Sequence, residues 1–475
     1  MIAGLSCAIM MQATFFPFIA QAQVLPMPTS GIISLPLLYI NPVIAPKPLI
    51  GEIHYRRVDA NTAELTGITY SDTTPGVSFT YDRLARQSTI TDGLGSRTFA
   101  YNASLQPDTE TITGLYNKTL TRNYETLGVI GRSTGLTDNA GYTVTYGYDT
   151  TGRFNSVGWS VNGVADTATY THVANSDLID TISTAAGQLT NYAYEPNRNL
   201  RTQIQNQFSA AAVSQYDYVY DALGRRSSVK NSGTAFGTAA FNLFNYNPRS
   251  ELADSLRYLG TNITNLTSPV TAETRQYNFD PIGNRTTITE GTNTGSYTPN
   301  NLNQYTTESI PTGGTNTNTF DQDGNLTQIA GNKNVTYTYD AENRLITAQP
   351  TTPVVNDKKT DFLYDYQGRR VQKIISNYNG VSWTATATKY FIYDGWNMIE
   401  EQTVAQPSKY FMWGLDLSQS LQGAGGIGGL LTQVESTNSY SYLADGNGNV
   451  GQLINKTTGT IDAQYEYDPF GNQLT

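Results

Sequence analysis

Aromatic residues alternate with other residues in short stretches of the chain, as in Tyr-Gly-Tyr (146–148) and Tyr-Val-Tyr (218–220). Because side chains of a strand point alternately to its two faces, this spacing places both rings on one face of a predicted strand. An Asp follows the second Tyr and suits the first position of a type I turn, and a Gly three residues later can adopt positive φ. An apolar or Thr- and Ser-rich stretch then leads away, so each copy predicts one β-hairpin.

The pattern returns along most of the chain. Its clear copies have their turn residues at Asp149 and Gly152, Asp221 and Gly224, Asp280 and Gly283, Asp321 and Gly324, Asp340 and Asn343, Asp365 and Gly368, and Asp468 and Gly471. Weaker copies lie around Asp82, Glu195, Asn247, Asn300 and Asp394. A recurring short period is the signature of a repeat array, in which neighbouring hairpins stack to bury faces that none can bury alone. We therefore predict an all-β fold of tandem hairpins joined into one long sheet.

Arginine follows the turn at a constant place in four copies, at Arg153, Arg225, Arg344 and Arg369. Neighbouring Asp and Arg positions can pair between hairpins, but exposed ion pairs contribute only about 0–1 kcal/mol each. Stacked Tyr pairs add about 0.5–1.5 kcal/mol beyond their buried area. We expect the Tyr pairs to be the principal contact between hairpins.

The N-terminal region has a different character from the repeats. An apolar run at 8–20 precedes the small-x-small triplet Ala20-Gln21-Ala22, which predicts a cleaved signal peptide over 1–22. A retained membrane helix is the alternative, although Pro17 and the polar residues leave less than the roughly 20 apolar residues that a span needs. A proline-rich stretch predicts a linker over 23–50, and the repeat region follows over 51–475. We expect export to the medium or to a bacterial cell surface, with membrane contact through the signal alone.

Composition narrows the functional classes. The chain has 33 Tyr and 42 Gly but only 14% charged residues, and its net charge is −10. This acidic balance argues against nucleic acid as a partner, because that affinity comes mostly from Lys and Arg. Cys7 is the single cysteine, so no intrachain disulfide can form, and His54 and His172 are the only histidines. We expect no cofactor, no metal site and no catalytic site, so the protein is predicted not to be an enzyme.

Four segments with possible chemistry have a simpler interpretation as turns or loops. Gly423–Gly429 contains a formal GxGxxG, but no helical periodicity follows it, as a dinucleotide loop requires. The segments 321–325 and 445–449 resemble calcium loops, yet both lack the Gly and Glu that an EF-hand needs at its sixth and twelfth positions. Asp468 lies in an Asp-Pro-x-Gly sequence at an ordinary turn position. Turn-forming Asp, Asn and Gly account for all of them.

The repeated Tyr-Asp-x-x-Gly resembles the YD repeat of Rhs proteins, teneurins and the cage-forming components of insecticidal Tc toxins. The copies extend over about 79–472, with repeats over 79–409. The last part, 410–475, looks like the run into the Rhs-associated core. Its matching segments are 410–417, 423–431, 442–450 and 467–472.

The resemblance implies a spiralling sheet that forms a hollow β-shell, here partial or open, able to enclose a protein cargo. In relatives a further core segment follows, carrying the autoproteolytic aspartates, and often a C-terminal toxin. The chain given ends at Thr475 before either, so we expect such a segment as a partner and self-association through open sheet edges. Relatives without a toxin imply the alternative, a cell-surface adhesion module that binds carbohydrate or a protein receptor. A toxin or glycosidase is the third and weakest hypothesis.

Overall fold

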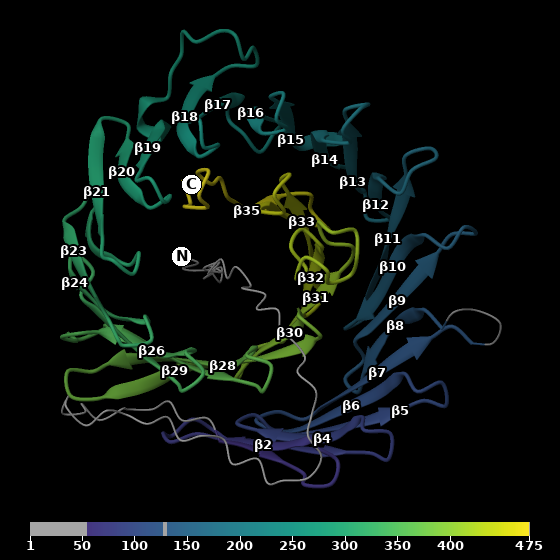
Figure 1. Ribbon diagram of the computed structural model, residues 1–475. Helices are drawn as coiled ribbons and strands as arrows, with labels where there is room; N and C mark the ends of the chain where they lie inside the picture. Colours follow the sequence, from purple (N-terminus) through teal and green to yellow (C-terminus); the bar gives the residue numbers. More distant parts are fainter. Residues whose placement is uncertain (1–54, 127–130, 475) are drawn as a thin grey trace, which may run out of the picture. The chain divides into compact units, whose positions relative to one another are not determined.

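A single antiparallel sheet forms the fold (Figure 1). The structure is a computed structural model and describes residues 55–126 and 131–474. Each of its 35 strands pairs with the next strand in the sequence, from β1 with β2 to β34 with β35. The one described helix is the 3-10 turn η1 (Thr271–Glu273), and no described helix has the length and apolar character to cross a membrane. The predicted all-β fold is confirmed. The predicted signal peptide and linker lie outside the described residues.

The first half of the sheet consists of β1 (Tyr55–Val58), β2 (Leu65–Thr69), β3 (Val77–Tyr81), β4 (Gln87–Asp92), β5 (Gly95–Tyr101), β6 (Pro107–Gly114), β7 (Lys118–Tyr124), β8 (Ser133–Asp138), β9 (Thr143–Tyr148), β10 (Phe154–Val161), β11 (Val164–His172), β12 (Ile179–Thr184), β13 (Gln188–Tyr194), β14 (Arg201–Phe208), β15 (Ala211–Tyr220), β16 (Arg226–Ser232), β17 (Ala240–Tyr246) and β18 (Leu252–Leu259). The second half consists of β19 (Arg275–Phe279), β20 (Arg285–Glu290), β21 (Asn293–Pro299), β22 (Tyr305–Ser309), β23 (Thr315–Phe320), β24 (Leu326–Gly331), β25 (Val335–Tyr339), β26 (Leu345–Pro350), β27 (Lys358–Tyr364), β28 (Arg370–Tyr378), β29 (Trp383–Asp394), β30 (Asn397–Thr403), β31 (Lys409–Trp413), β32 (Leu430–Glu435), β33 (Asn438–Ala444), β34 (Val450–Asn455) and β35 (Ile461–Gln464).

The motif turns lie on the same side of the sheet. The turns of an antiparallel meander alternate between the two ends of the strands. Every turn from an odd-numbered strand to the next even-numbered strand therefore lies on the same side of the sheet. The turns of Asp82, Asp149, Asp221, Asp280, Asp321, Asp340 and Asp365 all occupy such connections. We call this row of turns the motif rim.

The sheet winds inward, so that its last strands lie against its early ones (Figure 1). The hydroxyl of Tyr116 donates to the carbonyl of Phe391, 275 residues away, and that of Tyr142 donates to Phe411, 269 residues away. Further along, the Gly446 N–H donates to the Tyr218 hydroxyl across 228 residues. Across these three contacts the sequence distance between partners falls along the chain, as expected of an inward spiral. We call 55–339 the outer turn and 340–474 the inner turn.

The hydrophobic core lies between the two turns. The larger cluster joins Leu120 and Val157 of the outer turn to Ile392, Met412 and Val434 of the inner turn, all of them fully buried. A smaller cluster joins Ile204, Val213 and Tyr216 to Leu443 and Ile454. Burial of these inward faces drives the winding, since each sheet layer alone would leave them exposed to water. No described pairing joins β1 to β35, so the sheet is not closed into a barrel.

Candidate functional site in the motif rim and the seam between turns

The motif turn is built around one Asp carboxylate. In the copy at Asp149, Oδ1 accepts the N–H groups of Thr151 and Arg153, both at 2.9 Å. The Gly152 N–H donates to the Asp149 carbonyl at 2.9 Å, and Gly152 has a φ of +90°. The register then shifts at Phe154, which marks a β-bulge. This is a type I turn closed by a left-handed residue, a common hairpin connection.

All seven clear copies adopt the same conformation. Each motif Asp accepts at Oδ1 the N–H groups two and four residues later. The turn-closing residues have positive φ throughout: Gly152 (+90°), Gly224 (+79°), Gly283 (+95°), Gly324 (+88°), Asn343 (+58°), Gly368 (+78°) and Gly471 (+83°). The structure therefore repeats the same turn conformation along the motif rim.

The motif arginines pair within their own turn. Arg153 Nε lies 2.8 Å from Asp149 Oδ2, and Arg225 Nε lies 2.7 Å from Asp221 Oδ2. The ion pairs lie within each turn, because the bulge brings the fifth residue of the turn back onto the first. The expected Asp and Arg contact between hairpins occurs through the backbone, where Arg344 Nη1 donates to the Asp365 carbonyl at 3.2 Å. The free side of Arg225 instead covers the ring of Tyr246 in the next copy, at 4.5 Å.

The motif tyrosines join neighbouring hairpins through their hydroxyl groups. Tyr148 donates to the Ser133 carbonyl at 2.9 Å, and Tyr364 donates to the Leu345 carbonyl at 2.7 Å. Leu345 directly follows the motif turn that begins at Asp340. Within the described motif copies, a stacked Tyr pair occurs at Tyr465 and Tyr467. The expectation that stacked pairs are the principal contact is therefore wrong, since the hydroxyl bonds and Arg-on-Tyr contacts recur more often.

Some turns depart from the sequence interpretation. Asp394 closes a two-residue hairpin by pairing with Asn397, so it is not a motif turn. Asn102 was missed although it forms the full motif turn, because Leu105 (φ +66°) stands where Gly was expected. Asp445, considered above as a calcium-like loop, forms the same turn.

The glycine-rich loop is held by one carboxylate. Asp416, which is buried, accepts the N–H groups of Ala424 and Gly426 at Oδ2, and a strand, β32, follows the loop. It has no helix N-terminus for a pyrophosphate. Among the described residues, no three of His, Cys, Asp or Glu converge as a metal site would require.

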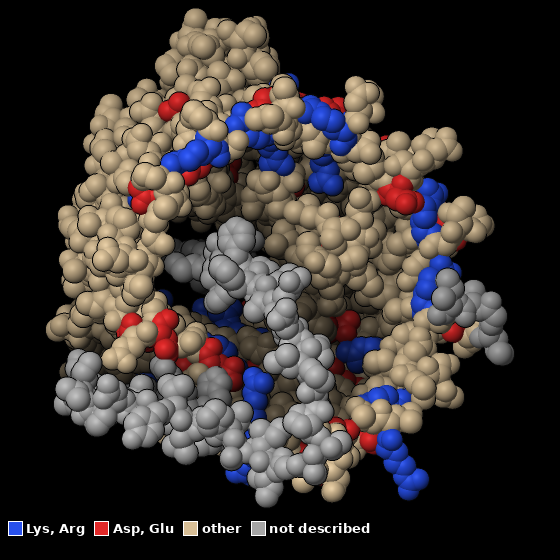
Figure 2. All heavy atoms as spheres, in the orientation of Figure 1, with Lys and Arg blue, Asp and Glu red and all other residues tan. Residues whose placement is uncertain are grey.

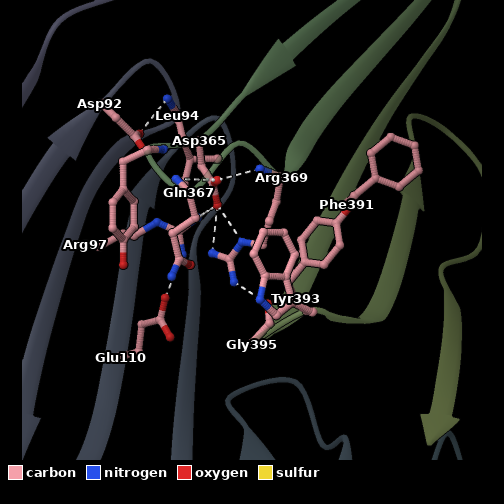
Figure 3. Close-up of polar contacts among 12 residues, drawn as sticks. Asp92, Leu94, Arg97, Glu110, Asp365, Gln367, Arg369, Phe391, Tyr393 and Gly395 are labelled. Atoms are coloured by element: carbon pink, nitrogen blue, oxygen red, sulfur yellow. Dashed lines mark hydrogen bonds and ion pairs between the residues drawn. The ribbon is translucent and has the colours of Figure 1, made fainter. Parts of the chain in front are cut away.

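Buried charges join the two turns of the spiral along what we call the seam. Arg97 of β5 lies 2.6 Å from Glu110 and 2.9 Å from Asp365, a motif Asp of the inner turn (Figure 3). Arg369 completes the cluster at 2.7 Å from Asp365. The Arg97 and Asp365 side chains are 1% and 0% exposed, so solvent screens this pair little.

Further ion pairs continue the seam in both directions. Arg122 bridges Glu110 and Asp394, at 3.2 and 2.9 Å. At the innermost end, Arg257 lies 2.9 Å from Glu466. Phe470, two residues into the last motif turn, packs on Tyr277 of the outer turn with ring centroids 4.8 Å apart.

Two buried lysines complete the seam. Lys118 contacts Asp138 and Glu400, whereas Lys456 of the inner turn pairs with Asp166 and lies 4.9 Å from the Trp159 ring. Burial disfavours the charge on both. The two carboxylates outweigh burial at Lys118 and raise its pKa, while burial prevails over the single carboxylate and lowers the pKa of Lys456. The pair of Lys456 and Asp166 has the opposite direction to the others: at Arg97, Lys118, Arg122 and Arg257 the outer turn supplies the cation and the inner turn an anion.

Comparisons with known proteins give one relative by sequence. No family model matches the chain. It is 30% identical over 208 residues to the tRNA3(Ser)-specific nuclease WapA of Bacillus spizizenii, a stretch that spans 42% of this chain and 7% of that protein. The crystal structure of TcdB2-TccC3-TEV covers 87% of this chain and 24% of its own at 13% identity and a TM-score of 0.47. That of TcdB2-TccC3-Cdc42 covers 88% and 26%, at 13% identity and a TM-score of 0.42.

Proposed function

We propose that this chain is a non-enzymatic shell of the Rhs/YD-repeat type, which encloses or presents another polypeptide. The observation that carries the proposal is the inward winding of one continuous sheet, held by buried ion pairs and a core between its turns. Figure 2 shows this unit hollowed on the inner side of the outer turn. A wall of this kind has few free backbone groups along its length, because every described strand except the two end strands is paired on both sides.

The relative found by sequence supports this assignment. The shared stretch is a small part of a protein named as a nuclease, as expected of a structural portion that accompanies an enzymatic one. The Asp residues of the seven clear motif turns have a structural role in those turns and do not need a catalytic interpretation. We propose on these grounds that the described part supplies containment and that catalysis, if the full protein has any, belongs to its cargo.

Secretion, or display at a bacterial surface, remains part of the proposal and rests on the N-terminal sequence alone. The net charge of −10 supports a polypeptide partner over nucleic acid. Self-association is proposed for the open ends of the sheet, where β1 and β35 each have one unpaired edge among the described strands.

A fusion experiment tests enclosure. A small folded reporter with a known protease cleavage pattern is attached after Thr475, next to the end that packs inside the outer turn through Glu466 and Phe470. The matched control carries the same reporter in the exposed loop at 262–265, between β18 and η1. Enclosure predicts that added protease digests the loop reporter and spares the C-terminal one. Equal digestion of both reporters would contradict the proposal.

A further inference from the structure

Three ionisable side chains of the seam converge in a way that the shell itself does not require. Lys118 at the start of β7 has its Nζ 2.8 Å from Asp138 Oδ2, at the end of β8. The same Nζ lies 2.6 Å from Glu400 Oε2, on β30 of the inner turn. The three side chains are 3%, 1% and 2% exposed, so they are more completely buried than most charged groups in proteins.

The triad is unbalanced in charge, with one ammonium group against two carboxylates. An amide formed from the ammonium and one carboxylate would leave one buried ion in place of three, and desolvation of each ion costs several kcal/mol. The surroundings are apolar, since Leu120, Tyr142 and Ile399 of the larger core cluster are buried nearby. Tyr142 also stacks on Tyr410 at 6.0 Å, and both rings are buried.

We propose that Lys118 and Asp138 form an intramolecular isopeptide bond, with Glu400 as the catalytic residue that carries the protons. The proposal does not depend on the nature of any cargo. Lysine is a nucleophile once it loses its proton, and groups held in contact react with effective molarities far above those in solution. A carboxylate within hydrogen-bond reach of the amine is positioned as a general base.

Asp138 is held as the electrophile. Its Oδ1 accepts the N–H groups of Ala140 at 2.7 Å and of Tyr142 at 2.8 Å, and these two donors stay in place as negative charge develops on that oxygen. Its Oδ2 faces Lys118 and is the oxygen that leaves. Among the described residues, Glu400 accepts at Oε1 from the Gln402 side chain and not from a pair of backbone N–H groups. The geometry therefore favours a bond to Asp138 over one to Glu400.

The reaction balances without any added reagent. A proton passes from the Lys118 ammonium to Glu400, and the neutral amine attacks Cγ of Asp138, forming the C–N bond. Glu400 returns this proton to Oδ2, accepts a second proton from the nitrogen and delivers it to the same oxygen. The C–Oδ2 bond then breaks and water leaves, so that ammonium and carboxylate become amide and water, and Glu400 is regenerated.

The position of Glu400 gives the bond a structural condition. Lys118 and Asp138 lie on neighbouring strands, but Glu400 joins them only when the inner turn has wound into place. The bond would then form after winding and would fix the β7–β8 hairpin beneath the inner turn. The chain contains its own comparison, because Lys456 and Asp166 form a buried pair that contacts no second carboxylate among its described ion pairs.

Mass spectrometry tests the proposal on the full chain. The expected result is an intact mass lower by one water molecule and a cross-linked peptide that joins Lys118 to Asp138, with no tryptic cleavage after Lys118. Lys456 is expected to remain unmodified. Finding the peptides of Lys118 and Asp138 unlinked would overturn the proposal, as would a cross-link from Lys118 to Glu400.

Two variants isolate the role of Glu400. Glu400→Gln keeps the side-chain shape but removes the proton carrier, so the cross-linked peptide is expected to disappear and the full mass to return. Glu401→Gln, on the next residue and paired with Lys389, is the matched control and should still cross-link. Strand content measured by circular dichroism establishes that both variants fold. A folded Glu400→Gln protein that still contains the bond would refute the assigned role.

Discussion

The motif rim and the seam use the same residue types in different ways. On the rim, an Arg pairs with the Asp four residues before it, as Arg153 does with Asp149, and both side chains are partly exposed. In the seam, Arg97 and Asp365 are 268 residues apart in sequence and fully buried. Contacts on the rim therefore stabilise individual hairpins, whereas contacts in the seam hold one turn of the spiral against the next.

Asp365 belongs to both regions, so it gives the strongest test of the comparison. Asp365→Asn should keep the turn, because Asn300 forms the same turn with an Asn. The variant should leave Arg97 and Arg369 without their shared carboxylate. The free energy of unfolding should fall by about 3–5 kcal/mol, because a buried charge that loses its partner is not compensated by solvent. The measurement is the midpoint of urea unfolding.

Asp149→Asn serves as the matched control on the rim. It removes one exposed ion pair, and its cost should be about 0–1 kcal/mol. Equal losses of stability in the two variants would show that the seam has no special role.

The next largest effect is expected at alkaline pH, which should destabilise the buried core between the turns more than the exposed rim. Burial raises the pKa of Tyr192 and of Tyr216 to about 12, because the phenolate is disfavoured in the core. The folded state keeps these protons after the unfolded chain begins to lose them near pH 10. Stability contributed by burial of the neutral phenols is therefore complete below pH 10 and is lost as pH rises towards 12, by about 2–3 kcal/mol for each group.

Spectrophotometric titration of tyrosinate measures this effect. More exposed phenols should ionise without change in structure, and the buried group should ionise together with loss of strand content. A single reversible titration that leaves the circular dichroism unchanged through pH 12 would argue against burial of these rings.

Phe470→Ala probes the innermost end of the seam. The Phe470 ring packs on Tyr277 and also lies 4.2 Å from the Arg285 guanidinium, but its side chain is half exposed. We expect a loss of about 1–2 kcal/mol from the aromatic and cation–π contacts. The same variant should raise protease cleavage within 461–474, whereas Leu223→Ala, at the equivalent but exposed rim position, should change neither quantity.

The sequence allows prediction of the rim because its determinants are local. Asp149 and Gly152 select one turn through nearest neighbours, and the repeats multiply that signal. Local reasoning fails at Leu105, which adopts a left-handed conformation that sequence preference assigns to Gly. The pairing of β5 with β6 on either side of the turn offsets the small cost of this backbone strain.

The seam could not be predicted in this way. Arg97, Lys118 and Glu400 lie outside the motif, and their partners depend on how far the sheet curls in one revolution. A signal was present, because Arg97 interrupts a strand of Ser, Thr and aromatic residues in a chain with 14% charged residues. A charge on the inward face of such a strand indicates a partner from another layer, but the sequence does not identify that partner.

The smallest expected effect is on the rim itself. Arg225→Lys keeps the positive charge near Asp221 but removes the planar group that covers Tyr246 and the Nη1 contact with Ser250 in the next hairpin. Because Arg and Lys differ in these planar contacts, the variant should lose about 0.5–1 kcal/mol in urea unfolding. Arg56→Lys, at an exposed position outside the motif, is the control and should lose nothing measurable. A loss as large as that of Asp365→Asn would mean that contacts between successive hairpins, and not those between turns, dominate the stability of the spiral.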